Sequence, residues 1–380
     1  MIKLPSLRDI KDLKGKRVLL RLDLNVPLKG GRVLDAYRIK RALPTIRFLK
    51  SQKAKVIILS HIGNDGAKSL RPIARYLNKT MNVGFYPKLD GRDLPQVVSA
   101  MREGGIMMLE NLRKDPGEKG NDMNFAQHLA CLGDIYVNDA FSVSHRSHAS
   151  VVLLPKLLPS YAGFLFEDEV RHLSRALKPS PPFFFILGGA KFETKIPLIK
   201  KFLKLADSVF VGGALSNNFF KEMGYEIGLS VADHKNFSLK PLLKNKKLIL
   251  PSDVVVKTRT GRLIKTIGSI RERDSIKDAG PKTLRALSAV AARAKFILWN
   301  GPLGNYEEGF DKGTIELLRI IANSKAESVV GGGDSLALIS KMRLEKKFTF
   351  VSTGGGAMLD FLANGTLPGI KALLNSKKKS

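Results

Sequence analysis

The sequence predicts an α/β fold made of two doubly wound parallel-sheet (Rossmann-like) domains joined by a hinge helix. Short runs rich in Val, Ile, Leu and Phe recur every 20 to 40 residues, with longer amphipathic stretches between them. These runs are apolar at consecutive positions, which indicates strands buried on both faces, as in a parallel sheet covered by helices. Near the middle of the chain, a proline-rich segment at 178–182 interrupts this pattern.

The expected strands follow the apolar runs in chain order. In the first half they lie at 18–22, 55–59, 83–86, 106–109 and 135–137. In the second half they lie at 183–187, 208–211, 248–250, 296–299, 328–330 and 349–351. A helix is expected at 166–177, because the prolines that follow cannot continue it. The predicted organisation is an N-terminal domain over 1–165, a hinge helix and linker over 166–182, and a second domain over 183–359.

Composition limits the classes of function. The chain has 380 residues, 44% of them hydrophobic, which is enough for two or three domains that each bury a core. Its single cysteine, Cys131, permits neither an internal disulfide nor a thiolate metal cage and favours a reducing compartment. Charges interrupt the first residues, and no apolar run approaches the roughly 20 residues of a membrane span. We therefore expect a cytoplasmic protein that does not enter a membrane.

The formal charge of +30 could serve nucleic acid, an anionic surface or small acidic substrates. The basic residues are spread along the chain, and their only dense run is Lys377-Lys378-Lys379. A dedicated nucleic-acid arm is usually more concentrated. Most of the excess is therefore interpreted as a solvated basic surface.

The residues that follow the expected strands differ between the two halves. Strands of the first half are followed by polar residues: Asp23 and Asn25, His61, Glu110-Asn111, and Asn138-Asp139. Strands of the second half are followed by glycines: Gly188-Gly189, Gly212-Gly213, Gly301, Gly331 to Gly333, and Gly354 to Gly356. Ligands of open parallel sheets bind outside the carboxyl ends of the strands. The two edges therefore look suited to different ligands.

The glycine triplets at 331–333 and 354–356 each join a strand to a helix, 23 residues apart. Glycine lets a backbone approach a ligand, and the free N–H groups of a first helical turn can bind phosphate; the alternative is a tight turn without a ligand. Asp334 follows the first triplet and is a natural Mg²⁺ carboxylate, a helix N-cap, or both.

Lys191 and Lys195 follow another glycine pair. Pro197 fits the first turn of a helix, which places Lys195 at or just before the helix start, where a cation needs a nearby anion. His145 and His148 have no third ligand nearby, so zinc is disfavoured. No GxxxxGK[ST], GxGxxG or protein-kinase signature is present.

Several motifs together resemble the phosphoglycerate kinase family from residue 17 to about 370. They include Arg21-Leu22-Asp23-Leu24-Asn25-Val26-Pro27, Ser60-His61-Ile62-Gly63, Leu109-Glu110-Asn111-Leu112-Arg113, Asn138-Asp139-Ala140-Phe141 with His145-Arg146, Trp299-Asn300-Gly301-Pro302 and Ser352-Thr353-Gly354-Gly355-Gly356-Ala357. The resemblance implies a glycolytic phosphotransferase with a carboxyl group as acceptor. It would move a phosphoryl group reversibly between 1,3-bisphosphoglycerate and ADP, giving 3-phosphoglycerate and ATP, with Mg²⁺. It also implies a monomer whose C-terminal segment, 360–380, packs back on the first domain.

The resemblance assigns site residues by position. The substrate acid would be held by Asp23, Asn25, Arg38, His61, Arg113 and Arg146, with Arg21 in support. On the nucleotide side, Lys191 and Lys195 would hold the phosphates, Gly212 and Gly213 would lie near the adenine, and Glu307 would lie at the ribose. Gly332, Gly333, Asp334 and Ser335 would complete that site, with Asp334 on Mg²⁺.

The acceptor is a carboxylate that is ionised at neutral pH, so no general base is needed. What remains is to align two anions and to neutralise charge on the transferring group. Arg38, Lys195, Mg²⁺ and the helix N-terminus after Gly354, Gly355 and Gly356 are expected to do this. Because these groups belong to opposite domains, hinge closure is a requirement of the reaction.

Some positions depart from the family pattern. Asn64 stands where the family usually has a phosphate-binding arginine, so weaker binding of phosphoglycerate is expected unless Lys68 or Arg71 reaches in. Ser142-Val143 replaces Gly-Thr, Ala214 replaces the third glycine of the adenine loop, and Asn305-Tyr306 replaces Val-Phe before Glu307. These changes could alter nucleotide preference.

Two classes of function remain at this point. One is the active enzyme with no specific nucleic-acid partner, and the other is a binding protein on the same scaffold, recruited to RNA, DNA or a membrane surface by its charge. Retention of Arg38, Lys195 and Asp334 together favours the enzyme.

Overall fold

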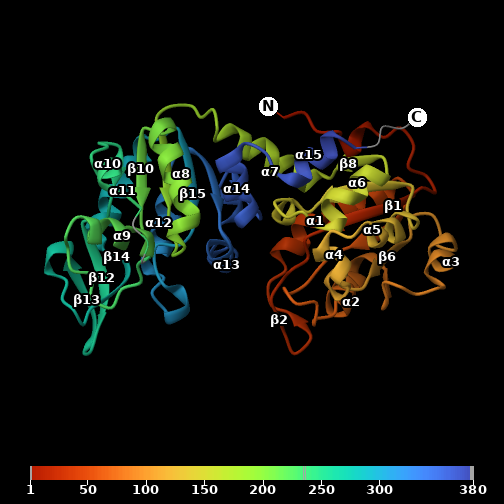
Figure 1. The fold of residues 1–380 in the computed structure, drawn as a ribbon, viewed down its shortest axis with the longest axis horizontal. Coiled ribbons are helices and arrows are strands. Elements are labelled where there is room, and N and C mark those ends of the chain that lie inside the picture. The colour runs from red at the N-terminus through yellow and green to blue at the C-terminus, as the bar shows by residue number, and fades with distance from the viewer. Residues whose placement is uncertain (1, 234, 236, 377–380) are drawn as a thin grey trace. The chain divides into compact units, whose positions relative to one another are not determined.

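The computed structural model describes residues 2–233, 235 and 237–376, and the run Lys377-Lys378-Lys379 lies outside this part. The chain divides into two compact units. Unit 1 comprises the described residues of Met1–Arg171 and Asn364–Ser380, and unit 2 is His172–Ala363. Helix α7 (Phe164–Arg175) contains the first boundary between them, and helix α14 (Gly356–Asn364) ends at the second (Figure 1).

Unit 1 contains a six-stranded parallel sheet in the order β5-β6-β4-β1-β7-β8. Its strands are β1 (Arg17–Leu22), β4 (Lys55–Leu59), β5 (Val83–Tyr86), β6 (Ile106–Leu109), β7 (Ile135–Asp139) and β8 (Ser160–Ala162). A short hairpin of β2 (Leu28–Lys29) and β3 (Arg32–Val33) follows β1. The central strands β4, β6 and β7 are buried almost throughout, because helices cover both faces of the sheet.

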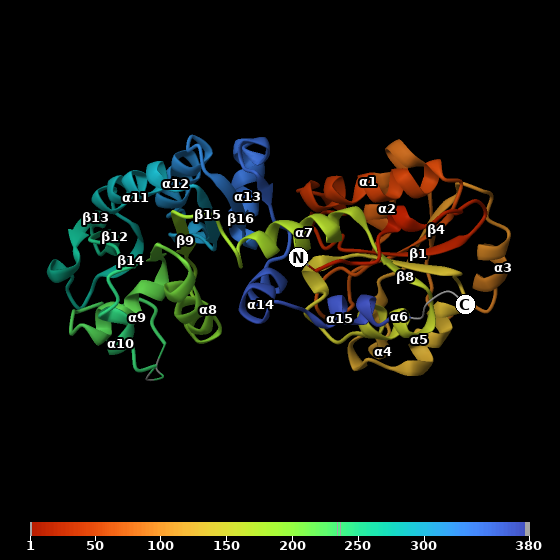
Figure 2. The ribbon, with the colours of Figure 1, turned by 90° about the horizontal axis from the view of Figure 1, so that it is seen from above.

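Figure 2 shows the two helical layers of unit 1. One face carries α1 (Tyr37–Ser51) and α2 (Arg71–Met81), and the other carries α4 (Pro116–Gly120), α5 (Met123–Ala130), α6 (Leu154–Leu157) and α15 (Pro368–Leu374). The short helix α3 (Leu94–Ser99) lies beyond β5. Helix α15 comes from the C-terminal end of the chain and contacts α6 and β8. The sheet edge formed by the ends of β1, β4, β6 and β7 is left for the candidate site.

Unit 2 contains a second six-stranded parallel sheet in the order β11-β10-β9-β15-β16-β17. Its strands are β9 (Phe183–Leu187), β10 (Ser208–Val211), β11 (Leu248–Ile249), β15 (Phe296–Asn300), β16 (Glu327–Gly331) and β17 (Phe350–Val351). The strand order reverses between β9 and β15, which is where open sheets of this kind bind ligands.

Helices also cover both faces of the sheet in unit 2 (Figure 2). One face carries α11 (Pro281–Arg293), α12 (Lys312–Ala322) and α13 (Gly333–Met342), and the other carries α8 (Phe192–Leu205), α9 (Ala214–Glu222), α10 (Lys240–Leu243) and α14. A three-stranded antiparallel sheet is added in the order β13-β12-β14, from β12 (Asp253–Thr258), β13 (Gly261–Thr266) and β14 (Ser275–Ala279).

The predicted fold class is confirmed, and each predicted strand overlaps an observed one. The antiparallel sheet, the β2–β3 hairpin and β8 were not predicted. The predicted start of the helix near Lys195 is wrong, because α8 already begins at Phe192 and Pro197 lies inside it. In the second turn of α8, this proline removes the N–H that would otherwise bond to the Glu193 carbonyl. The predicted helix at 166–177 is α7, which begins and ends two residues earlier.

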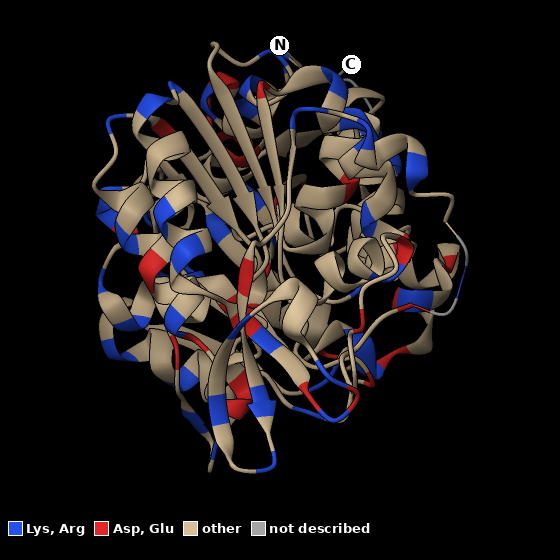
Figure 3. Ribbon diagram, turned by 90° about the vertical axis from the view of Figure 1, so that its left-hand side faces the viewer, with Lys and Arg blue, Asp and Glu red and all other residues tan. Residues whose placement is uncertain are grey.

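The basic residues are spread over the molecule and are not gathered in one element. Figure 3 shows Lys and Arg on helices, strands and loops, with Asp and Glu between them. In the described part of the chain, no helix has both the length and the apolar composition needed to cross a membrane.

Candidate functional site

Asp23 and Arg38 form a partly exposed ion pair at the polar edge of unit 1. Asp23 follows β1, and its carboxylate accepts hydrogen bonds from Arg38, from the Ser142 hydroxyl and, at 3.0 Å, from the Asn25 amide. Burial would raise the pKa of Asp23, but Arg38, His61 and these hydrogen bonds outweigh it and lower the pKa to about 2. The ionised Asp23 therefore fixes the orientation of the Arg38 guanidinium. The Arg38 side chain remains 22% exposed.

Arg21 is the second-last residue of β1 and is fully buried. Its Nε donates to Ser150 Oγ at 2.9 Å, and its guanidinium lies 3.7 Å from Glu118, which is also fully buried. Glu118 in turn accepts from the Ser150 amide at 2.9 Å and from its hydroxyl at 2.6 Å. The pair is thus fully hydrogen-bonded, as a buried ion pair must be if it is not to destabilise the fold.

His61 follows β4 and is neutral. Its Nδ1 lies 3.3 Å from a guanidinium nitrogen of Arg21, and because a guanidinium can only donate, Nδ1 accepts and the ring proton is on Nε2. Burial, and then the charges of Arg21, Arg113 and Arg38, lower the pKa of His61 well below its usual value, against the attraction of Asp23. The imidazole can therefore donate one hydrogen bond from Nε2 to a ligand.

Arg113 follows β6 in the 3-10 helix η2 (Leu112–Lys114). It donates to the Gly63 carbonyl at 2.5 Å and to Asn64 Oδ1 at 3.2 Å, while its buried Nε has no partner. Burial, and then the neighbouring charge of Arg146, lower the pKa of Arg113. Two cations held this close, one with an unused buried donor, favour an anion between them.

Side-chain hydrogen bonds from Asn111 hold the loop around Asn64 in place. Asn111 donates to the carbonyls of Ile62 and Lys68, both at 2.8 Å. Arg71 does not point to this loop, because its guanidinium lies 4.9 Å from the centre of the Phe85 ring. Instead, an ammonium reaches it from α4, where Lys119 Nζ donates to the Asn64 carbonyl at 3.3 Å.

Arg146 is exposed, in the loop after β7. Asn25 Oδ1 accepts from the Gly63 amide at 3.1 Å, which joins the loop after β1 to the loop after β4. All the residues predicted for the substrate acid thus lie at one edge of unit 1, with the arginines contributed by four separate segments.

In unit 2, Lys195 lies against the glycine pair that ends β9. Only 8% of it is exposed, and its Nζ donates to the Gly188 carbonyl at 2.6 Å. Burial lowers the pKa of Lys195 to about 8, although the Asp334 carboxylate opposes this; Lys191, exposed at the N-cap of α8, adds to it. The ammonium therefore loses its proton as the pH rises above about 8, unless an anion bound beside it raises the pKa again.

The glycines around Lys195 leave no room for side chains. A Cβ at Gly188 would lie 2.2 Å from the Pro302 carbonyl, and one at Gly189 (φ +98°) would lie 2.5 Å from Lys195 Nζ. Gly332 (φ +111°) lies against the Gly301 amide nitrogen, 3.0 Å from where its Cβ would be. These turns let the ends of β9, β15 and β16 approach one another closely.

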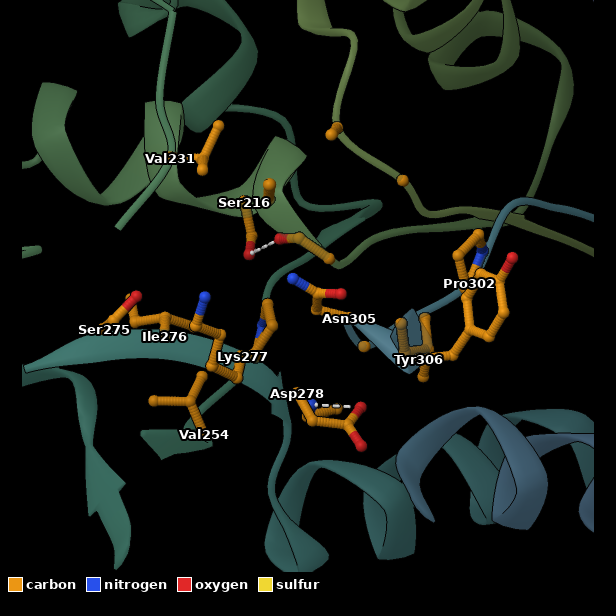
Figure 4. A pocket seen from close by; sticks show the side chains of 18 of the residues that line it. Ser216, Val231, Val254, Ser275, Ile276, Lys277, Asp278, Pro302, Asn305 and Tyr306 are labelled. Carbon is orange, nitrogen blue, oxygen red and sulfur yellow. Dashed lines mark hydrogen bonds between the residues drawn. The ribbon is translucent and has the colours of Figure 1, made fainter. Parts of the chain in front are cut away.

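A cavity of about 300 Å³ opens next to these turns. Of the residues predicted for the nucleotide, Gly213, Glu307 and Asp334 line this cavity, whereas Gly212 does not; a Cβ at Gly212 would meet the Phe210 ring at 2.6 Å. Figure 4 shows the side chains around the cavity, with Tyr306 and Pro302 at one side and Ile276 and Val254 at the other. It is the right size and mixture of polar and apolar surface for a small organic ligand.

The two predicted glycine triplets each begin a helix. Gly333 is the first residue of α13 and is exposed with open space around it, while Ser335 is buried and its Oγ has no partner. Gly354 and Gly355 precede α14, and Gly356 is its first residue. The last carbonyls of this helix, of Leu362 and Ala363, accept from Lys201 Nζ of α8 at 2.7 and 2.9 Å. Both triplets thus present N–H groups at the same edge as Lys195.

Mg²⁺ fits this edge only as an ion that is shared with a ligand. Among the described residues no group of three or more His, Cys, Asp or Glu could hold a metal. Asp334 is an exposed carboxylate at the glycine turn, and a single carboxylate combined with phosphate oxygens is a usual environment of Mg²⁺.

Some residues of the site were not predicted. Glu118, Ser142 and Ser150 hold the arginines and Asp23 in place, although they lie up to 129 residues away in the sequence. In the sequence Glu118 has the pattern of an acidic residue in the first turn of a helix, which gives no sign of burial.

The chain is similar to known proteins over nearly its whole length. The family model described as "Phosphoglycerate kinase" matches residues 7–365. A phosphoglycerate kinase of Wolbachia pipientis subsp. Culex pipiens is 42% identical over 99% of this chain and 100% of its own length, and one of Fervidobacterium nodosum is 41% identical over 98% and 99%.

Two solved structures share the fold over nearly the whole chain. The phosphoglycerate kinase of Coxiella burnetii has a TM-score of 0.83 and 39% identity, covering 99% of this chain and 100% of that one. The enzyme of Pyrococcus horikoshii has a TM-score of 0.87 and 32% identity, covering 98% of both chains. The chain therefore belongs to the phosphoglycerate kinase family, whose reaction is the reversible phosphoryl transfer between 1,3-bisphosphoglycerate and ADP.

Proposed function

We propose that the polar edge of unit 1 binds the phosphoglycerate and that the glycine edge of unit 2 binds ATP or ADP. The observation that carries this proposal is the gathering of cations with spare donors at the carboxyl ends of both sheets. In unit 1 the carboxylate, hydroxyl and 3-phosphate are assigned to Asp23, Asn25, Arg38, His61, Arg113 and Arg146, with Arg21 behind them.

In unit 2 the phosphates are assigned to Lys191, Lys195 and the turn of Gly332 to Ser335, and the nucleoside to the cavity beside Gly213 and Glu307. Ser335 Oγ is buried without a partner and supports this assignment, because a phosphate oxygen would accept a hydrogen bond from this hydroxyl.

The mechanism requires positioning and charge neutralisation rather than proton transfer. The attacking carboxylate of 3-phosphoglycerate is already ionised, and Arg38, oriented by Asp23, holds it. Lys195 and the free N–H groups after Gly354 to Gly356 stabilise the negative charge of the transferring phosphoryl group. Because donor and acceptor bind to different units, transfer requires the units to approach each other.

Mg²⁺ would be held by Asp334 together with the nucleotide phosphates. When bound, it supplies positive charge that neutralises the phosphate oxygens during transfer. Asp334 would orient the nucleotide through this ion, while Lys195 acts on the phosphate directly.

A coupled assay with ATP, Mg²⁺ and 3-phosphoglycerate tests the proposal. We expect turnover in the unaltered protein and a loss of at least about a hundredfold in kcat for Arg38→Ala, since an oriented charge is removed. Arg47→Ala changes an exposed arginine on the same helix and should leave kcat unchanged. Absence of turnover in the unaltered protein would refute the proposal.

We also infer a cytoplasmic monomer with no specific nucleic-acid partner. The lone Cys131 and the dispersed positive charge support this inference. Nonspecific binding of polyanions should collapse as salt rises, because it depends on counterion release. Light scattering of the purified chain, together with titration of duplex DNA at two salt concentrations, would test both points.

A further inference from the structure

The cavity in unit 2 has two chemically different ends. Gly189 and Asp334 line the end nearest the lysines, where a phosphate chain would lie under the proposed function. Val231, Val254 and Ile276 line the other end, with apolar walls that suit a flat aromatic base. The polar side chains between these walls therefore face the edge of the base.

Lys277 and Asn305 are two of these side chains, and one carboxylate fixes both. Glu308 Oε1 accepts from Lys277 Nζ at 2.8 Å and from Asn305 Nδ2 at 2.9 Å. The Asn305 amide donates to the Lys277 carbonyl at 2.9 Å, and Asn305 Oδ1 caps the 3-10 helix η6 (Tyr306–Glu308) by accepting from the Glu308 amide. The orientation of the Asn305 side chain is thus set, with its nitrogen beside Lys277 (Figure 4).

Both side chains keep hydrogen-bond donors to spare. An ammonium has three N–H groups and an amide has two, and each has one partner here. Other polar groups of the wall are engaged: Ser216 donates to the Gly213 carbonyl at 2.8 Å, and Asp278 accepts from the amides of Ala279 and Gly313. Lys277 and Asn305 therefore offer two adjacent hydrogen-bond donors at this wall.

We propose that Lys277 and Asn305 read the base of the nucleotide and make the pocket accept guanine nucleotides at least as well as adenine nucleotides. Guanine presents two neighbouring acceptors, O6 and N7, whereas adenine presents an amino donor beside N7. Adjacent donors match the first pattern and place donor against donor in the second. This inference rests on the proposed function, since it places the nucleoside in this cavity.

The test compares GTP with ATP in the kinase assay and GDP with ADP by calorimetry. GTP should give a kcat/KM at least equal to that of ATP. Lys277→Met should lower the GTP-to-ATP ratio about tenfold or more, the size expected for losing a hydrogen-bonding contact to a base. Lys277→Arg, which restores a cationic donor, should recover most of the ratio.

Lys257→Met is the matched control. Lys257 binds the other oxygen of the same carboxylate, at 3.2 Å, but it is 57% exposed and does not line the cavity. The GTP-to-ATP ratio of kcat/KM in Lys257→Met should equal that of the unaltered protein. An unchanged ratio in Lys277→Met, or a tenfold preference for ATP in the unaltered protein, would overturn the inference. If neither nucleotide supports turnover, the proposed function fails, and the GDP-to-ADP affinity ratio still decides the inference.

Discussion

The polar edge of unit 1 and the glycine edge of unit 2 are built in opposite ways. The edge of unit 1 is built from buried side chains: Arg21, Glu118 and His61 are each less than 3% exposed. Hydrogen bonds between segments far apart in the sequence hold these side chains in place. Unit 2 uses backbone turns in which glycines leave room for ligand and lysine. The difference suits the ligands proposed for the two edges, because a small acid can be enclosed by side chains, whereas a phosphate chain can lie along a backbone.

The comparison implies that the side-chain interactions of the polar edge also stabilise unit 1. The glycine edge of unit 2 acts differently, because its close turns exclude any larger side chain. Trp299 is the chain's only tryptophan and is buried in unit 2, so its fluorescence reports the unfolding of that unit alone. Circular dichroism reports both units. Together they can separate the effects of substitutions on each.

The largest effect is expected for Glu118→Ala. It leaves Arg21 buried without its carboxylate, so the free energy of unfolding of unit 1 should fall by about 3–5 kcal/mol. The urea midpoint by circular dichroism should fall while the Trp299 transition stays unchanged. Glu193→Ala removes an exposed pair with Lys235 and should cost less than about 1 kcal/mol. Equal losses of unfolding free energy in Glu118→Ala and Glu193→Ala would contradict a stabilising role of the buried polar edge.

Gly188→Ala should have the next largest effect, now on unit 2. Its Cβ would meet the Pro302 carbonyl at 2.2 Å, so the Trp299 transition should lose about 1–3 kcal/mol. Gly333→Ala is the matched change, because a Cβ there meets open space. It should leave the transition unchanged but weaken ATP binding measured by calorimetry. Full ATP affinity in Gly333→Ala would show that no ligand approaches this turn.

Lys195 should make ATP binding depend on pH. Its pKa of about 8 in the free protein means that the ammonium is mostly present at pH 7 and mostly lost at pH 9. Because the phosphates favour the charged form, ATP affinity should fall about tenfold from its plateau to pH 9. Lys195→Arg stays charged and should abolish this fall, whereas Lys191→Arg should retain it. A flat profile in the unaltered protein would contradict the assignment.

The smallest effect is expected for Asn64→Arg in unit 1. An added guanidinium gives a further phosphate donor, but Arg113 lies 3.2 Å from Asn64 Oδ1 and would repel it. The KM for 3-phosphoglycerate should therefore fall only about threefold, less than a full charge-assisted hydrogen bond would give. The KM for ATP serves as the internal control. An unchanged KM for 3-phosphoglycerate would mean that Lys119 already fills this role.

The sequence predicted the parallel sheets well because their strands are buried on both faces and therefore continuously apolar. The antiparallel sheet escaped prediction because β13 is exposed along most of its length, so its residues, such as Arg262 and Lys265, resemble a loop. Lys195 was placed too early in its helix because Pro197 is usually found at a helix start.

The site could be predicted only as far as its motifs extend. Residues directly after strands were found because strand ends converge at one edge of a parallel sheet. Glu118 and Ser150 were missed because their role depends on packing between distant segments. Lys277 and Glu308 were missed because the strand and the turn that carry them meet only in the folded unit.

The C-terminal helix α15 has a consequence for synthesis on the ribosome. It contacts α6 and β8, and the Gly369 amide donates to the Ser144 carbonyl at 2.8 Å, in the segment between Asn138 and Arg146. Unit 2 is one continuous stretch of chain and needs no residue beyond Ala363 to complete its core. Unit 1 begins first but receives its last helix only when the final residues have been added. A premature stop codon after residue 363 would therefore spare unit 2 and leave unit 1 without its last helix.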